Sequence, residues 1–185
     1  MAERENKTTL SIYARFFRGE REAVAELAAL HRTGLVLFVN GYVRDLDVAE
    51  DLASDAFAAL LIKRPKIKDE AHFKTYLFSM GKNAALSYLR KHKRTLSQRE
   101  NTADRETPES ALIREERRRA VVAAIGKIKG ENRDVLLLRF YEELSVNDIA
   151  KILRKNKKQV YNLLQRAKST LKEILEKENI VYEAD

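Results

Sequence analysis

One stretch near the C-terminal end carries side chains that could read duplex DNA. Residues 155–168, KNKKQVYNLLQRAK, hold amide, phenol and amine groups at helical spacing. In the major groove, Asn and Gln can each pair with adenine through two hydrogen bonds, and Lys or Arg can pair with guanine. The base-contact candidates are Lys158, Tyr161, Asn162 and Gln165, and the phosphate candidates are Lys157, Lys158, Arg166 and Lys168. We therefore predict that one face of this stretch binds DNA.

The same stretch needs an element that buries its other face. Apolar residues recur at the spacing of one helical face, at Val160, Leu163, Leu164 and Ala167. Upstream, Ser145 and Asp148 have the spacing of a capping box before a shorter helix, and a polar turn around residues 154–156 follows that helix. This order indicates a helix-turn-helix, whose second helix enters the major groove. The alternative is a surface helix of an ordinary bundle whose charges are solvated.

A second set of candidates lies in a long helix predicted over residues 71–94. Aromatic and cationic side chains alternate there, and such side chains can stack on unpaired bases and follow the backbone of a single strand. The candidates on this helix are Phe73, Lys74, Tyr76, Lys82, Asn83 and Arg90. The alternative is that the aromatic residues belong to the core, because Phe73, Leu77 and Tyr88 share one helical face.

An acidic cluster lies at the start of the helix predicted in DVAEDLASDAFAALLIKR. Its carboxylates are Asp45, Asp47, Glu50, Asp51 and Asp55. Sites for Mg²⁺ or Ca²⁺ usually need convergent carboxylates in a defined loop, and this spacing is different. The histidines also lack the spacing of metal ligands. We therefore expect no metal site, and favour helix capping or a contact with another protein.

The composition favours a polyanionic partner. The 185 residues include 36 Lys and Arg against 28 Asp and Glu, which gives a formal net charge of +8. Nucleic acid is the main candidate for the partner, and an anionic membrane surface is the weaker one. The absence of cysteine excludes disulfides, thiolate zinc sites and cysteine nucleophiles. Because no nucleotide-binding or hydrolase motif is found either, we expect no enzyme activity, no cofactor and no small-molecule substrate.

The ends and the apolar content indicate a cytoplasmic protein without direct membrane insertion. The N-terminal MAERENKTTL lacks the apolar region of a secretory signal. No stretch approaches the roughly 20 apolar residues of a membrane-spanning helix.

The chain is predicted to be all-α, with two small helical domains joined by a flexible linker. Helical periodicity fills residues 10–94, and resumes over 110–178. Between them, residues 95–109 have almost no apolar side chains and include Pro108, as expected of an exposed linker. In the second domain, Asn132 is the expected N-cap of the helix that precedes the helix-turn-helix.

Both halves, in this order, resemble bacterial RNA polymerase sigma factors of the extracytoplasmic-function (ECF) group. DVAEDLASDAFAAL is similar to the family's AED-L-x-Q-x-x-F pattern, and FKTYLFSMGKNAALSYLRKHKR resembles the helix that follows it. RDVLLLRFYEELSVNDIAKIL and QVYNLLQRAKSTLK resemble the helix-turn-helix of the same family. The resemblance extends over about residues 19–175.

This resemblance implies a transcription initiation factor that binds core RNA polymerase and directs it to promoters. The C-terminal, region-four-type domain would read the upstream promoter element as duplex. The N-terminal, region-two-type domain would melt the downstream element and hold it as a single strand, with Lys66 and Lys68 of its loop taking part. The flap of the second-largest polymerase subunit is an implied partner, and an anti-sigma factor is a further candidate. The residues implied to dock on the clamp helices of the largest subunit are Asp47, Glu50, Asp51, Ser54 and Asp55.

The sequence departs from the family pattern at a few informative positions. Ser54 replaces a common Gln in the acidic helix, and Leu163 replaces a common Arg. Arg154 replaces the usual Gly of the turn, so the turn either avoids positive φ there or tolerates some strain. The sequence of the upstream element therefore does not carry over from the family.

An autonomous helix-turn-helix regulator is the alternative function. Such a regulator would use its N-terminal domain to dimerise or to sense a ligand, and would bind a palindromic operator without polymerase. A nucleic-acid-processing enzyme is the remaining class, and would need metal-dependent turnover from the acidic cluster.

Overall fold

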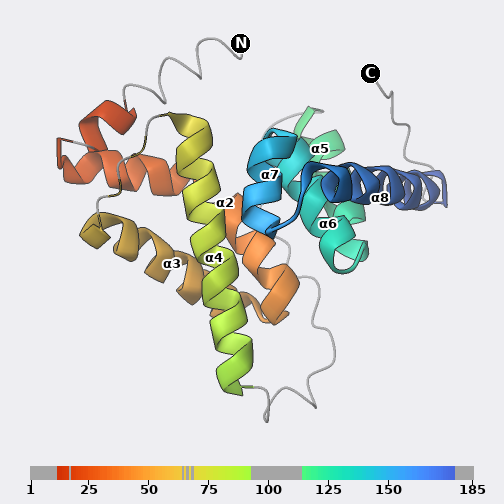
Figure 1. Ribbon diagram of the computed structural model, residues 1–185, viewed down its shortest axis with the longest axis horizontal. Helices are drawn as coiled ribbons and strands as arrows, with labels where there is room; N and C mark the ends of the chain where they lie inside the picture. Colours follow the sequence, from red (N-terminus) through yellow and green to blue (C-terminus); the bar gives the residue numbers. More distant parts are fainter. Residues whose placement is uncertain are drawn as a thin grey trace.

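The computed structural model describes residues 12–16, 18–63, 65, 67, 69–92 and 114–177 (Figure 1). Every regular element in these ranges is helical, and none is a strand. This confirms the predicted all-α class and its organisation into two helical domains. The linker expected at residues 95–109 lies outside the described residues.

The N-terminal domain is built from α2 (Arg21–Val43), α3 (Leu46–Lys63) and α4 (Glu70–His92), which pack against one another. Between α2 and α3 the chain turns at Arg44, whose left-handed backbone (φ 54°) lets its N–H donate to the carbonyl of Asn40. The carboxylate of Asp45 then accepts from the Val48 N–H at 3.2 Å and satisfies a free donor at the start of α3. The domain therefore begins α3 with its acidic residues in the first turns, where the helix dipole favours them.

The C-terminal domain contains α5 (Arg114–Lys127), α6 (Glu131–Leu136), the π-helical segment η2 (Leu137–Tyr141), α7 (Val146–Leu153) and α8 (Lys157–Lys177). The prediction that Asn132 caps α6 is wrong. Gly130 holds the cap position, with a φ of 65°, and Asn132 is already inside the helix. A glycine adopts this backbone at no steric cost, which explains why the helix begins there.

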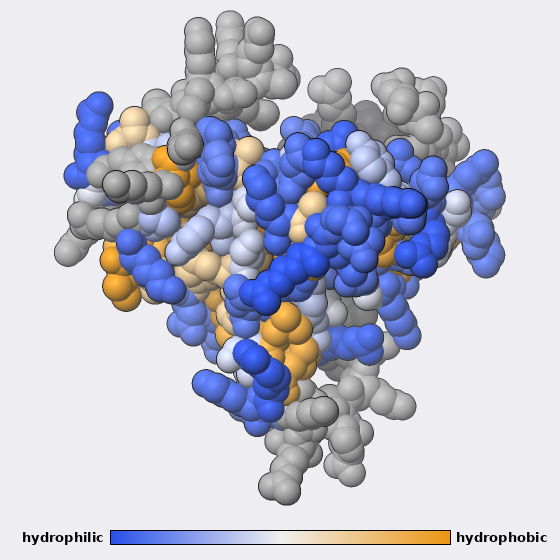
Figure 2. Space-filling view, in the orientation of Figure 1, coloured by the Kyte–Doolittle hydropathy of each residue, from blue (hydrophilic) through white to orange (hydrophobic). Residues whose placement is uncertain are grey.

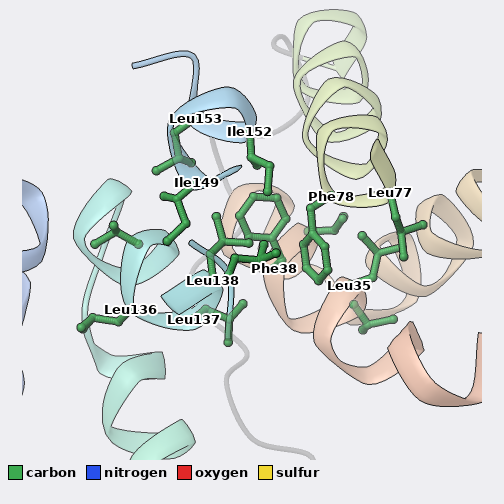
Figure 3. Packing of buried hydrophobic residues seen from close by; sticks show 14 of the residues in the cluster. Leu35, Phe38, Leu77, Phe78, Leu136, Leu137, Leu138, Ile149, Ile152 and Leu153 are labelled. Atoms are coloured by element: carbon green, nitrogen blue, oxygen red, sulfur yellow. The ribbon is translucent and has the colours of Figure 1, made fainter. Parts of the chain in front are cut away.

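The two domains share one continuous hydrophobic core. Helix α7 packs across α4, and α6 and η2 reach α2 (Figure 1). Figure 3 shows Ile152 of α7 and Leu138 of η2 pointing toward the ring of Phe38, which belongs to α2. On its other side, Phe38 meets Phe78 of α4 edge-on, with ring centroids 5.3 Å apart. Helices of the C-terminal domain therefore seal one side of the N-terminal bundle.

Candidate nucleic-acid and polymerase interfaces

The helix-turn-helix is formed by α7 and α8, with local hydrogen bonds at the start of each helix. Ser145 caps α7 as predicted, because its hydroxyl accepts from the Asp148 N–H at 3.2 Å. Arg154 ends α7 in the left-handed region at φ 57°, so the turn keeps the backbone that favours glycine. At the start of α8, Asn156 and Gln159 exchange reciprocal hydrogen bonds, at 2.8 and 2.9 Å. Sequence reasoning missed this capping box, although its N-x-x-Q spacing was there to find.

Helix α8 presents all of the predicted upstream-element side chains to solvent. Its buried stripe is Val160, Leu163, Leu164, Ala167, Leu171 and Leu175. The exposed predicted residues are Lys157, Lys158, Tyr161, Asn162, Gln165, Arg166 and Lys168. Tyr161 is 57% exposed, so its ring and hydroxyl are accessible on this face. Figure 2 shows that the side of the molecule carrying α7 and α8 is largely hydrophilic.

Phe140 lies beside this face and was not predicted as part of it. It is 42% exposed at the end of η2, and the ammonium of Lys168 is 5.5 Å from the centre of its ring. This cation–π contact holds Lys168 at the edge of the α8 face.

Only part of the predicted single-strand set on α4 lies at the surface. Phe73 is 1% exposed and packs between Tyr13 and His31, so its ring is a core residue and offers no surface for stacking. Tyr76 is half-buried against the core, and Arg90 is exposed. Lys66 and Lys68 lie outside the described residues.

The remaining members of the α4 set contact the C-terminal domain. The Lys74 ammonium donates to the carbonyl of Glu142 at 3.1 Å, and that of Lys82 donates to the carbonyl of Leu153 at 3.0 Å. The Asn83 side chain accepts from the Arg154 guanidinium at 3.0 Å. In this arrangement the ammonium groups of Lys74 and Lys82 are therefore satisfied by carbonyls of the C-terminal domain.

The acidic set on α3 forms one solvent-facing side of that helix. Asp47, Glu50, Asp51, Ser54 and Asp55 are all exposed, opposite the buried Ala49, Ala53, Ala56, Phe57 and Leu60. The Ser54 hydroxyl donates to the carbonyl of Glu50 at 2.9 Å, so it turns back onto its own helix. Arg32 of α2 contacts the Glu50 carboxylate at 3.3 Å and partly neutralises this end of the face. Among the described residues no group of His, Asp and Glu is arranged to hold a metal ion.

Known proteins match this chain in both domains. The family model of sigma-70 region 2 matches residues 27–95, and that of sigma-70 region 4 matches residues 118–171. The chain is 24% identical over 163 residues to RNA polymerase sigma factor YlaC of Bacillus subtilis, covering 85% of this chain and 94% of YlaC. It is also 24% identical over 151 residues to the ECF RNA polymerase sigma factor SigX of the same organism, covering 77% and 78%.

This chain belongs to the ECF group of RNA polymerase sigma factors. The resemblance identified from its motifs is thereby confirmed. The fold agrees with a solved structure, that of CnrH in complex with the cytosolic domain of CnrY, at a TM-score of 0.58 and 21% identity. That match covers 89% of this chain and 95% of CnrH. No helix in the part of the chain that the structure describes is long and apolar enough to cross a membrane.

The boundary between the two domains of this sigma factor contains buried charge. Arg133 and Glu142 of the C-terminal domain are only 9% and 5% exposed. Arg133 donates to the carbonyl of Leu37 in α2 and lies 3.3 Å from the carboxylate of Asp134. Glu142 lies 3.8 Å from the imidazole of His31. Burying such groups is costly unless they are paired, and Arg133 has both a carbonyl and a carboxylate beside its guanidinium.

Burial also shifts the acid–base behaviour of this boundary. It raises the pKa of Asp134 to about 6, although a hydrogen bond from Tyr42 and the charge of Arg133 oppose the shift. Desolvation lowers the pKa of the Lys82 ammonium, and the carboxylates of Asp134 and Glu131 act against that change. These two titrating groups come from different domains, so their pKa values depend on how the domains pack together.

Proposed function

We propose that this sigma factor directs core RNA polymerase to promoters by reading two DNA elements in different forms. Helix α8 reads the upstream element as duplex, through Lys158, Tyr161, Asn162 and Gln165 at base edges. The cations that flank them hold phosphates, which set the register of the helix on the duplex. Helix α4 and the loop before it hold the downstream element as a melted single strand.

The exposed polar face of α8 is the observation that carries this proposal. Amide, phenol and cationic groups lie together on one side of a capped helix whose other side is buried in the core. A major groove accepts one helix, and this helix has spare hydrogen-bonding groups on its outward side.

Core polymerase binding is assigned to the acidic side of α3. Its carboxylates are exposed and lie on a different part of the N-terminal domain from the α4 contacts with the C-terminal domain. The clamp helices of the largest subunit are the proposed partner of this side, and the flap of the second-largest subunit is that of the C-terminal domain. Two weak DNA contacts and a polymerase contact on one chain act at high effective concentration, which suits the moderate net charge of +8.

Transcription in vitro tests the proposal. Core RNA polymerase of the host bacterium is incubated with this protein and a genomic promoter library, and the transcript starts are mapped. Starts that depend on the protein and share two sequence elements would support the proposal. The absence of such starts, together with tight binding of the free protein to a palindromic duplex, would replace it by an autonomous regulator.

A further inference from the structure

Phe140 is placed beside α8 by the packing of the segment that carries it. Helix α6 packs against α8, and η2 continues α6 directly. Within η2, Leu137 and Leu138 are buried in the core, whereas Phe140 turns outward and is 42% exposed. The core therefore fixes the position of this ring, while part of the ring stays accessible next to the outward side of α8.

The ring of Phe140 attracts the ammonium of Lys168 without neutralising it. The Nζ atom lies over the ring, 5.5 Å from its centre. An aromatic face attracts a cation through its quadrupole, carries no net charge, and does not use up the N–H donors of the ammonium as a carboxylate would. Lys155, by contrast, lies 2.9 Å from the carboxylate of Glu131. Within α8 itself the first carboxylate is that of Glu173, so the charge of Lys168 remains available to an anion.

Lys168 lies at one end of the side of α8 that is proposed to read bases. Lys157 and Lys168 are about three helical turns apart, so they lie on the same side of the helix, about 16 Å apart along its axis. Tyr161, Asn162 and Gln165 lie between them in the chain. Because a major groove is about 12 Å wide, the two lysines fall beside the phosphates that border the groove when the middle of this side faces the bases.

Restricting a lysine side chain before DNA binds should strengthen its contact with a phosphate. A mobile lysine loses rotamer freedom when it binds, and this loss of entropy weakens the contact. The contact with Phe140 already restricts the side chain of Lys168 in the unbound protein. Less entropy is then lost on binding, which is the general advantage of preorganisation.

We propose that Phe140 is a positioning residue for duplex binding, which presents the ammonium of Lys168 to a phosphate of the upstream element. Phe140 acts through Lys168, so its effect does not depend on the base sequence. This inference rests on the proposed function of α8.

A double-mutant cycle tests whether the two residues act together. The full chain is titrated against a fluorescent duplex pool of random sequence, and polarisation gives Kd. Phe140→Leu keeps an apolar side chain and removes the ring, so it should weaken binding about two- to fivefold, the strength of an exposed cation–π contact. In the Lys168→Ala background the same change should have no effect. An equal effect in both backgrounds would overturn the proposal, because Phe140 would then act on the fold or on DNA by itself.

The salt dependence of duplex binding is a readout that a purely structural role would not move. Lys168→Ala should reduce the slope of log affinity against log salt concentration by about 0.9, the value for one phosphate. Phe140→Leu retains the ammonium and should keep the parent slope, and Phe140→Tyr retains the ring and should bind as the parent does. The matched control is Lys172→Ala, whose ammonium lies 3.7 Å from the carboxylate of Glu176 and which should keep the parent slope. An unchanged slope in Lys168→Ala would overturn the proposal.

Failure of the proposed function has a different signature. If α8 does not read duplex, Lys157→Ala and Lys168→Ala would both keep the parent slope, and promoter-specific transcripts with core polymerase would be absent. If Lys157→Ala lowers the slope while Phe140→Leu leaves duplex affinity unchanged, the proposed function stands and only the role of Phe140 is lost. Loss of core polymerase co-purification in Phe140→Leu, with unchanged duplex affinity, would assign the ring to a polymerase contact and overturn the proposal.

Discussion

The guanidinium of Arg154 donates a hydrogen bond to the side chain of Asn83 across 3.0 Å, and so joins the turn of the helix-turn-helix to α4. One residue thereby belongs to the duplex-reading unit and contacts the helix proposed to hold the single strand. Arg154 also stands in a left-handed backbone that usually favours glycine. The hydrogen bond to Asn83 stabilises the folded state and so offsets part of the free-energy cost of this backbone conformation.

Replacing Arg154 by glycine should show both effects. Arg154→Gly relieves the left-handed strain and loses the bond to Asn83, whereas Arg154→Ala loses the bond and keeps the strain. We expect the glycine variant to exceed the alanine variant by about 1 kcal/mol in free energy of unfolding. Urea denaturation followed by circular dichroism measures this difference. Equal stability of the two variants would mean that the turn carries no strain at this position.

Single substitutions on α8 should separate base reading from phosphate binding. Asn162→Ala and Gln165→Ala should each cost about 1–3 kcal/mol of binding to the preferred upstream element, and relax specificity at one position. Lys157→Ala should weaken binding to all duplexes alike and reduce the salt dependence. Competition binding with single-base variants of the element distinguishes these outcomes. Lys172→Ala, at an exposed site beyond the proposed face, is the control that should change little.

Charge reversal on α3 should abolish core polymerase binding and spare DNA binding. Asp51→Lys/Asp55→Lys places two cations on the exposed acidic side of α3. A partner surface that is complementary to carboxylates would repel them. Co-purification with core polymerase should be lost, while the affinity for duplex upstream element is retained. Glu22→Lys/Glu173→Lys makes the same change in net charge elsewhere and should leave co-purification intact. Retained polymerase binding in the α3 variant would move the docking site away from this helix.

Stability should depend on pH through Asp134. Because burial raises its pKa to about 6 in the folded protein, the folded state binds a proton more tightly than the unfolded chain does. The contribution of this group to stability is then fully present below about pH 4, and is lost as the pH rises through about 6. Between those limits the change should be on the order of 2–3 kcal/mol.

The comparison with Asp134→Asn isolates this contribution. Urea denaturation is run at pH 4.5 and pH 7 on both proteins, because other carboxylates titrate alike in each. On going to pH 4.5, the parent should gain stability relative to Asp134→Asn. A constant difference between the two proteins across that range would show that Asp134 does not titrate there.

Much of this sigma factor could be predicted where the cause is local. The stripe from Val160 to Ala167 predicted the buried side of α8, and hence the exposed side with its polar groups, because helical periodicity alone assigns each residue to a side. The cap at Ser145 followed in the same way from a hydroxyl placed before an apolar run. At Phe73 the two interpretations differed, and packing against Tyr13 and His31 decided for the core.

The sequence by itself therefore determined the helices, their faces and the two domains, since each depends on residues within a few turns of one another. Only the tertiary structure decided that α7 closes over α4, and that Glu142 and Arg133 enter the space left by Gly34 and Gly41. Glu142 and Gly34 are far apart in the chain. Nothing in the local pattern of either residue indicates that Glu142 is buried or that its carboxylate lies against Gly34. Such a contact arises from the shapes of two folded surfaces, which no periodicity encodes.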